Sequence, residues 1–343
     1  MTGTHRRMHL AVHLPATATG RGPLDFAALE RLARTAERGL FDYLVVGPDA
    51  APGSQQPHPG GVPYAAHEPM AVLSALAAVT ERIGLVAGAA PGAHEPFELA
   101  RALATLDHLS GGRAAWHLVG PGGPGDGHTA EFVGTARELW DSWTPDGRPR
   151  TFDHRGRHFT VSGEFTVPRS PQGHPVVMHA LGPDDAAGCG SALTTADVLC
   201  PAHRTAEDDR TPRADAAPRS TAHVRTPDDL LVMARAVCVL GTTDAEARDH
   251  ARVAGVDDND AAGPPAFVGT PDTVAAALAE HVARGAADGF VLVPRHPFDL
   301  LDTLEVFVSE VVPMLQERGA FRTEYAGRTL RGHLGFPEPV WRG

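Results

Sequence analysis

Histidines recur at the downstream ends of the apolar runs of this chain, where their side chains could share one chemical environment. The chain has 19 histidines among its 343 residues. An imidazole titrates near neutral pH and polarises oxygen atoms, so converging histidines are candidates for acid–base or oxygen chemistry. So many histidines also place several near such ends by chance, and this structural interpretation stays open. The histidines at these ends are His13, His117, His179, His203 and His296.

Other reactive side chains are scarce. All 30 positively charged residues are arginine, which excludes Schiff-base catalysis and a Walker-type phosphate lysine, since each needs an amine. The three cysteines, Cys189, Cys200 and Cys238, form no CxxC pair, so a cysteine-rich zinc site and a disulfide framework are excluded. The chain has no HExxH motif, and its first strand has no HxH pair. We therefore expect no metal site.

A glycine-rich stretch at 120–125 follows a predicted strand and precedes a predicted helix. It reads GPGGPG and formally matches the GxGxxG pattern of dinucleotide-binding turns. Pro121 and Pro124 lack two of the backbone N–H donors that hold a pyrophosphate in such a turn. We therefore interpret this stretch as a plain loop.

Short apolar runs alternate with amphipathic stretches, and this alternation would position the histidines. The stretch 24–40, for example, carries Phe26, Leu29 and Leu32 at helical spacing. The apolar runs are continuous, as expected for strands buried on both faces. The predicted strands are 8–14, 41–46, 83–87, 113–119, 175–180, 196–200, 231–240 and 289–293. The predicted helices are 24–40, 67–79, 95–106, 130–143, 184–194, 243–253, 271–284 and 300–316.

Eight strands separated by helices predict an α/β fold, namely a (β/α)8 TIM barrel with a small inserted β-hairpin. The carboxyl ends of the strands form the active-site face of such a barrel, so the histidines would meet there. A doubly wound sheet is the alternative. We expect one domain over 1–343, with the hairpin at about 150–173, an irregular loop at about 201–227 and a C-terminal tail over 319–343. The hairpin strands are predicted at 159–161 and 165–167, around a turn at 162–164.

The charge balance excludes some partners. The chain has 42 acidic and 30 basic residues, a formal net charge of −12, which argues against nucleic acid and anionic membrane surfaces as partners. No apolar run is long enough for a signal-peptide core or a membrane span. Together with the odd number of cysteines, this favours a cytoplasmic location.

Two long segments resemble the bacterial-luciferase-like flavin monooxygenases. They are LSALAAVTERIGLVA at 73–87 and ATLDHLSGGRAAW at 104–116. The similarity is greatest to the branch that acts on nitrilotriacetate, dibenzothiophene sulfone and pristinamycin precursors. Shorter matches follow in family order at 139–143, 153–156, 168–173, 269–271, 285–290 and 321–325.

The resemblance implies a TIM-barrel enzyme that binds reduced FMN and uses O₂ to oxidise a small organic substrate. Such enzymes usually receive the reduced flavin from a separate NAD(P)H:flavin reductase and are often homo-oligomers. Related barrels employ F420, which keeps that cofactor open as a variant. The resemblance implies no metal.

The resemblance also assigns site residues by their position in the family's motifs. The residues at flavin-contacting positions are Gly88, His117, Val119, Leu181 and Gly182. The candidates for catalysis are His13, His117 and His296. The candidates for substrate binding are Asp49 and His179.

The match is closer in the framework than in the site. The family has a flavin-contacting Thr where this chain has Gly88, and an Asn where it has His117. Its phosphate-binding Tyr and Ser have no counterpart, and a long segment before Gly269 is missing. Two other hypotheses therefore stay open. One is a flavin-free homologue that acts as a partner subunit or small-molecule binder, and the other is a flavin-independent enzyme that uses the strand-end histidines.

Overall fold

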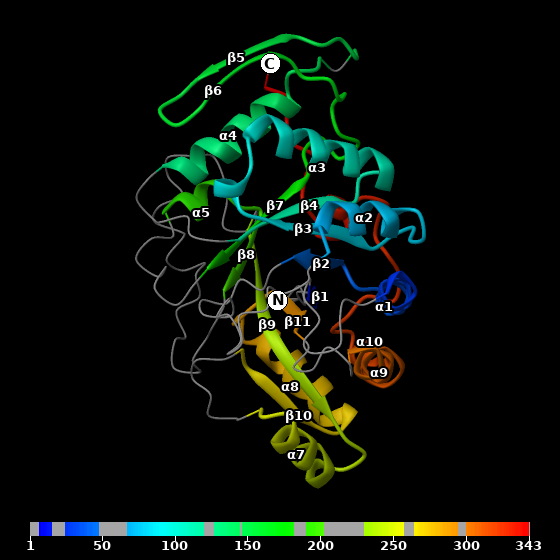
Figure 1. Cartoon of the computed structure of the whole chain (residues 1–343). Coiled ribbons are helices and arrows are strands. Elements are labelled where there is room, and N and C mark those ends of the chain that lie inside the picture. Colours follow the sequence, from blue (N-terminus) through cyan, green and yellow to red (C-terminus); the bar gives the residue numbers. More distant parts are fainter. Residues whose placement is uncertain are drawn as a thin grey trace, which may run out of the picture.

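Eight parallel strands close into a barrel that helices surround (Figure 1). The hydrogen-bonded order is β1, β2, β3, β4, β7, β8, β9, β11, and the ring closes where β11 pairs with β1. The α/β fold class and the TIM barrel are thereby confirmed. This computed structural model describes residues 7–15, 25–47, 67–119, 127–144, 146–181, 190–201, 230–256, 264–293 and 300–342.

The elements follow the predicted alternation, with ends that move by a few residues. The barrel strands are β1 (His9–Pro15), β2 (Tyr43–Gly47), β3 (Gly84–Ala89), β4 (Ala114–Leu118), β7 (Val176–Leu181), β8 (Val198–Pro201), β9 (Leu231–Leu240) and β11 (Gly289–Leu292). The helices between them are α1 (Phe26–Arg38), α2 (Pro69–Ala77), α3 (Pro96–Ser110), α4 (His128–Trp140), α5 (Gly190–Thr195), α7 (Asp244–Val253) and α8 (Pro271–Ala283). A short 3₁₀ turn, η1 (Pro91–Ala93), precedes α3.

Local signals explain where these helices begin and end. Asp25 caps α1, because its carboxylate accepts the Ala28 N–H at 2.7 Å. Thr243 and Thr270 cap α7 and α8 in the same way. Gly111 ends α3 in the left-handed conformation, with φ of 69°, which a residue without Cβ adopts at no steric cost.

The inner side chains of the barrel are stacked in layers. Because neighbouring strands are staggered, each layer takes its four residues from alternate strands. Following the strand registers gives one layer of Ala11, Val86, Met178 and Met233. All four belong to the buried cluster that fills the barrel. These apolar residues form the floor beneath any site at the carboxyl ends.

Three aspartates fix the amino ends of the strands. Each directly precedes a strand and accepts a backbone N–H from the neighbouring strand. The pairs are Asp42 with Leu10 at 2.9 Å, Asp197 with Val177 at 3.0 Å and Asp288 with Val232 at 2.8 Å. A buried carboxylate needs such donors, since burial otherwise disfavours its charge.

The C-terminal tail closes the amino end of the barrel. Arg322 forms an ion pair with Asp42, and Arg331 approaches Asp197 to 3.2 Å. Arg331 belongs to the short helix α11 (Leu330–His333). The first residue of this helix, Leu330, is fully buried in the cluster that fills the barrel. The tail therefore supplies both cations and apolar contacts to strands formed much earlier in the sequence.

The inserted hairpin is present, but its predicted strands and turn were wrong. Strand β5 (Thr151–Arg155) pairs antiparallel with β6 (Thr160–Glu164), so the predicted turn at 162–164 lies in a strand. The chain turns at 156–159 because the Glu131 carboxylate accepts three backbone N–H groups there, at 2.8–3.1 Å. Phe165 then leaves the hairpin and packs edge-on against Phe97, with ring centroids 5.6 Å apart.

Two further elements differ from the prediction. Strand β10 (Ala266–Gly269), which pairs with the end of β9, was not predicted, since four residues give little periodic signal. The closing helix is divided into α9 (Leu300–Val306), a π-helical segment η5 (Phe307–Val311) and α10 (Val312–Glu317). Pro313 has no N–H for a regular helical hydrogen bond at this point.

Parts of two predictions fall outside the described residues. The helix predicted at 184–194 is described only as α5, and 182–189 are not described. The irregular loop predicted at 201–227 lies outside the described residues after Pro201.

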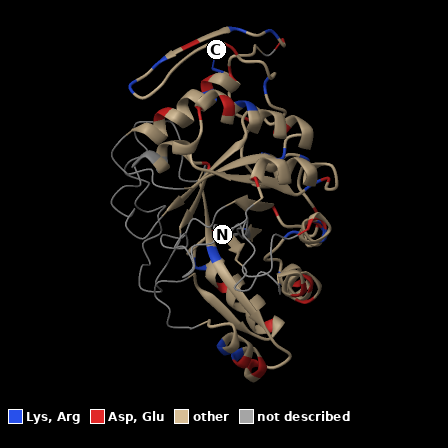
Figure 2. Ribbon diagram, in the orientation of Figure 1, with Lys and Arg blue, Asp and Glu red and all other residues tan. Residues whose placement is uncertain are grey.

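Charged residues lie mainly on the outer helices and the hairpin, and the strands carry few of them (Figure 2). Among the helices that the structure describes, none has the length and apolar character needed to cross a bilayer.

The Asp42–Arg322 pair generates a stability prediction. Burial raises the pKa of Asp42, but Arg322 and His9 lower it by more than burial raises it. The pKa therefore falls from its ordinary value of 3.8 to about 2. The carboxylate therefore contributes stability above its unfolded pKa, and this contribution is lost as the pH falls from about 4 towards 2. We expect Asp42→Asn to lower the free energy of unfolding by about 3–5 kcal/mol at neutral pH, because Arg322 stays buried without its anion.

Urea denaturation at a series of pH values measures this effect. Glu98→Gln is the matched control, since the Glu98–Arg101 pair is half exposed and should change the free energy by less than about 1 kcal/mol. Equal effects of the two substitutions would contradict the role assigned to Asp42.

Candidate functional site

Four inward-facing residues form a layer near the carboxyl ends of the strands. They lie two positions beyond the floor residues Ala11, Val86, Met178 and Met233 on the same strands. Side chains alternate between the two faces of a strand, so these four also face the barrel interior. We call them the mouth layer: His13, Gly88, Ala180 and Arg235.

The mouth layer has two unlike halves. In the strand order, β1 and β9 lie on one side, and β3 and β7 on the other. His13 and Arg235 therefore make a basic half, and Gly88 and Ala180 a small half directly across the barrel. His13 is 6% exposed and Arg235 9% exposed. A basic wall thus faces a wall that has almost no side chain.

The layer between the mouth and the floor contains Val45, His117, Cys200 and Val291. His117 lies on β4, between β3 and β7, and so beneath the small half. It is 7% exposed. His13 and His117 therefore belong to adjacent layers of the barrel interior.

Backbone continues the small half outwards. Gly47 ends β2, one residue beyond Val46, which pairs with Ala87 of β3. A Cβ at Gly47 would lie 2.7 Å from the Gly88 Cα, closer than real Cβ contacts come. The ends of β2 and β3 can approach this closely only because Gly47 has no side chain.

Burial keeps the other reactive groups of the barrel neutral. It raises the pKa of the Cys200 thiol to about 12, although the positive charge of Arg235 and the Tyr43 hydroxyl act in the opposite direction. Burial also raises the pKa of Tyr43 well above its ordinary value. Neither group is suited to act as a base or nucleophile near neutral pH. The imidazoles are the better candidates for moving a proton.

His179 does not lie in the mouth. Its neighbour Met178 faces inwards, so His179 faces outwards, where its Nε2 is 3.0 Å from the Thr195 hydroxyl. Burial lowers the pKa of His179 to about 4, with a contribution from the charge of Arg137. The structure therefore does not bring His179 together with His13.

The remaining predicted residues lie on the inner face of a strand, on the outer face of a strand, or outside the described residues. Val119 follows β4 and shares the inward alternation of His117, whereas Leu181 belongs to an outer cluster with Ala192 and Leu199. The predicted residues outside the described part of the chain are Asp49, Gly182 and His296.

Sequence reasoning missed Arg235. It is the only charged residue in the ten-residue strand β9, and a lone charge in an apolar strand was a usable signal. Buried arginines are rare and are held by specific partners or functions. Its inward direction could be assigned only once the strand register was known.

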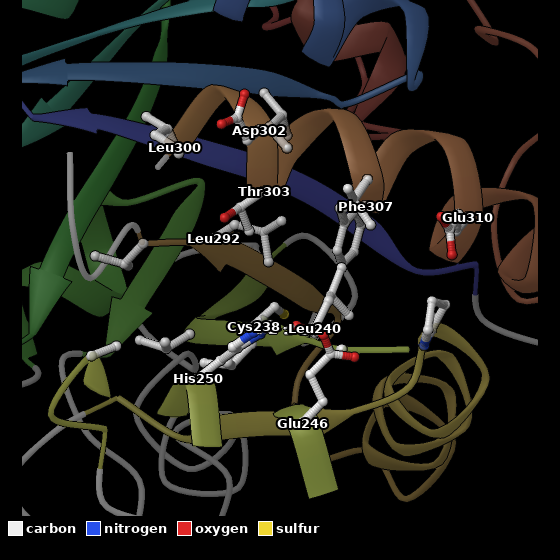
Figure 3. Close-up of a pocket in the computed structure, with 18 of the residues that line it drawn as sticks. Cys238, Leu240, Glu246, His250, Leu292, Leu300, Asp302, Thr303, Phe307 and Glu310 are labelled. Atoms are coloured by element: carbon white, nitrogen blue, oxygen red, sulfur yellow. Dashed lines mark hydrogen bonds and ion pairs between the residues drawn. The ribbon is translucent and has the colours of Figure 1, made fainter. Parts of the chain in front are cut away.

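A hollow lies outside the barrel wall, between the end of β9, α7 and α9. Its volume is about 610 Å³. Leu300, Thr303 and Phe307 line one side, and Cys238, Leu240 and His250 the other (Figure 3). His250 is within 3.0 Å of the Leu240 carbonyl oxygen through its Nδ1. None of the predicted site residues that the structure describes lines this cavity.

Within the described residues, no group of three or more His, Cys, Asp or Glu side chains is arranged to hold a metal ion. The chemistry that this mouth offers comes from imidazole, guanidinium and apolar walls.

Comparison with known proteins identifies the family. The luciferase-like monooxygenase family model matches residues 8–263. N-acetyl-S-(2-succino)cysteine monooxygenase of Bacillus subtilis (strain 168) is 32% identical over an alignment that covers 100% of this chain and 99% of the relative. Component A of nitrilotriacetate monooxygenase from Aminobacter aminovorans is 29% identical, with 92% of this chain and 91% of the relative covered.

A solved structure agrees with these matches. EDTA monooxygenase from Chelativorans sp. BNC1 superimposes with a TM-score of 0.81 and 26% identity, over 97% of this chain and 99% of that one. The alignment with the Bacillus subtilis enzyme has 446 positions against 343 residues here, a difference of 103 positions without a residue in this chain. The resemblance and the expected monooxygenase activity are confirmed: the chain belongs to the luciferase-like monooxygenase family.

Proposed function

We propose that this chain is the oxygenase of a two-component system, which binds reduced FMN at the barrel mouth and uses O₂ on a small organic substrate. The observation that supports this most directly is the asymmetry of the mouth layer. Gly88 and Ala180 leave room for a flat ring, and Gly47 extends the same wall as backbone. In a member of the luciferase-like monooxygenase family, a flavin ring is the group that fits such a space.

The residues present fit the ring half of the cofactor. The small half offers a flat surface, and His117 beneath it offers an imidazole where a ring-edge hydrogen bond is needed. Apolar residues of the floor layer exclude water from below. Residues 48–66, 120–126 and 182–189, which follow β2, Val119 and β7, lie outside the described residues.

Each nearby residue has a proposed role. Reduced flavin supplies the two electrons that activate O₂. His117 holds the ring edge, with Val119 beside it, and His13 exchanges a proton with the substrate from the opposite wall. His296 remains a proposed catalytic residue, Gly182 a proposed cofactor residue and Asp49 a proposed substrate residue.

The partners are proposed from the same family membership. The name of the Aminobacter aminovorans relative, component A, marks it as one part of a multi-component enzyme. We propose that a separate NAD(P)H:flavin reductase supplies reduced FMN to this chain, that the chain forms a homo-oligomer, and that it works in the cytoplasm. F420 remains an alternative cofactor for the same wall.

Gly88→Val tests where the ring binds. A valine at this position fills the small half, and we expect FMN affinity to fall about tenfold or more, since overfilling a packed site costs about 1–3 kcal/mol. Binding is measured by flavin fluorescence, and with reduced FMN under anaerobic conditions. Gly134→Ala is the matched control, because a Cβ at this helical position meets no atom within 4 Å.

Two results would overturn the proposal. One is the absence of binding of both FMN and F420 at tens of micromolar. The other is an unchanged FMN affinity of a folded Gly88→Val protein.

His117→Asn tests the imidazole beneath the ring. Asparagine supplies an amide donor at the same place in a smaller side chain, so we expect FMN affinity to be preserved or increased. The measurement is the same titration. A loss of affinity would show that the imidazole has a role other than holding the ring edge.

His179→Gln tests whether His179 supports the outer layer of the barrel and not the substrate. The folded-state pKa of about 4 is lower than the ordinary 6.5. The unfolded chain therefore binds the proton first as the pH falls, and up to about 3 kcal/mol of stability is lost between 6.5 and 4. A glutamine has no such titration, so we expect a flatter stability profile over this range.

Thermal unfolding at several pH values, with FMN titration in parallel, measures both properties. His94→Gln is the control, because His94 is exposed. A change in FMN or substrate affinity with an unchanged pH profile of stability would contradict this role.

A further inference from the structure

We propose that the cavity outside the barrel wall is a second binding site, for a small organic cation with an apolar body, of the alkylamine class. The cavity has a volume of about 610 Å³, and sites for small organic ligands are hollows of this order of size with mainly apolar walls. The site is separate from the barrel mouth, because Val12 lines the cavity while its neighbour His13 belongs to the mouth layer on the other face of β1.

The cavity begins where β9 extends beyond its neighbour β11. Leu292, the last residue of β11, pairs with Ala236, whereas β9 continues to Leu240 and pairs there with β10 on its other side. Helix α9 and the segment η5 face this end of β9 across the cavity, and Phe307 projects into it (Figure 3). Close-packed protein interiors leave few voids larger than a water molecule, so a space of this size between regular elements is a candidate ligand site.

The apolar character of the walls continues to the edge of the cavity. Leu240, Leu300 and Phe307 contribute to the walls. Val253 is 87% exposed and Val306 is 37% exposed, and both border the cavity. Large exposed apolar side chains that gather at one place mark a surface on which a ligand binds. Covering them with an apolar ligand would remove their surface from water, which stabilises the complex.

The charged groups around the cavity are acidic. Asp302 lies on α9 and Glu310 on η5, and Glu246 lies across the cavity on α7 (Figure 3). Among the described residues that line the cavity there is no arginine. Hydrogen bonds from Thr242 lower the pKa of Glu246, so this carboxylate is charged at neutral pH. The field at the cavity therefore attracts a cation and repels an anion.

His250 adds a hydrogen-bond acceptor to this acidic side. Its Nδ1 lies 3.0 Å from the Leu240 carbonyl oxygen, which can only accept, so Nδ1 carries the proton. In the neutral imidazole Nε2 then holds a lone pair, and it lies 3.9 Å from Glu246 Oε1. Acceptors on this wall match the N–H donors of an ammonium group and leave a carboxylate without a donor.

Three ligands with one chain length and different head groups test the charge preference on the unaltered protein. They are hexylamine, 1-hexanol and hexanoate, titrated by calorimetry at two ionic strengths, with and without saturating FMN. We expect hexylamine to bind about tenfold or more tightly than hexanoate, with hexanol between them. Only the ionic ligands should respond to salt, and FMN should leave all affinities unchanged.

Four results of these titrations would overturn the proposal. They are equal affinities of the three ligands, tightest binding of hexanoate, no binding of hexylamine at millimolar concentration, and competition between hexylamine and FMN.

Modification of Cys238 locates the bound amine. Cys238 lines the cavity and is partly exposed, whereas Cys200 is buried. We expect saturating hexylamine to slow the reaction of Cys238 with methyl methanethiosulfonate severalfold, as measured by mass spectrometry of the peptide that contains it. An unchanged rate in protein that has bound hexylamine would place the amine elsewhere, and the proposal would be wrong.

Substitutions then separate charge from shape. Asp302→Asn should weaken hexylamine binding about threefold and leave hexanol binding unchanged, since it removes one acidic partner at an exposed edge. Glu305→Gln is the matched control, because Glu305 is an exposed residue of the same helix that does not line the cavity. Equal effects of these two substitutions would reduce the preference to the net charge of the protein and contradict a specific site.

Thr303→Trp fills the cavity from α9 and should weaken the binding of both hexylamine and hexanol about tenfold or more. Sedimentation of the same variant tests a different occupant. If no amine binds to the unaltered protein and Thr303→Trp changes the oligomeric state, a second copy of the chain covers this surface and the proposal is wrong.

Discussion

The stagger of eight parallel strands is the constraint on which the site depends. Once the ring closes, the register decides which residues share a layer, and a layer takes one residue from every second strand. His13, Gly88 and Arg235 are far apart in the sequence, yet they meet at one level. Their meeting needs no contact between loops, since backbone hydrogen bonds alone set their heights. The chemistry of the mouth is therefore a property of the sheet.

Much of the fold could be predicted from the sequence. Continuous apolar runs and helical stripes identified all eight barrel strands, because burial on both faces leaves a continuous apolar run. The resemblance added the family, and it directed attention to Gly88, which lies in the mouth layer, and to His117, which lies in the layer beneath. The hairpin turn could not be predicted in this way, because Glu131 on a distant helix fixes it.

The details of the site depended on side-chain direction, which periodicity does not give. His179 and Leu181 lie at the end of the correct strand but on its outer face, and a difference of one residue decides this. Arg235 was overlooked because it lies in the middle of a strand, and the sequence did not show whether its side chain points into or out of the barrel. The cavity outside β9 is bordered by α7 and by Pro271. Only the three-dimensional arrangement shows that residues of β9, α7 and α9 line one hollow.

The pairing of Arg322 and Arg331 with Asp42 and Asp197 has a consequence for synthesis of the chain. Each carboxylate emerges from the ribosome well before the guanidinium group that neutralises it, which follows 280 residues later for Asp42 and 134 residues later for Asp197. A nascent barrel would have to bury two anions before their counter-ions exist, which is unfavourable. Ring closure should therefore wait until Arg322 and Arg331 have been synthesised, and shorter nascent chains should remain open to proteolysis and to chaperones.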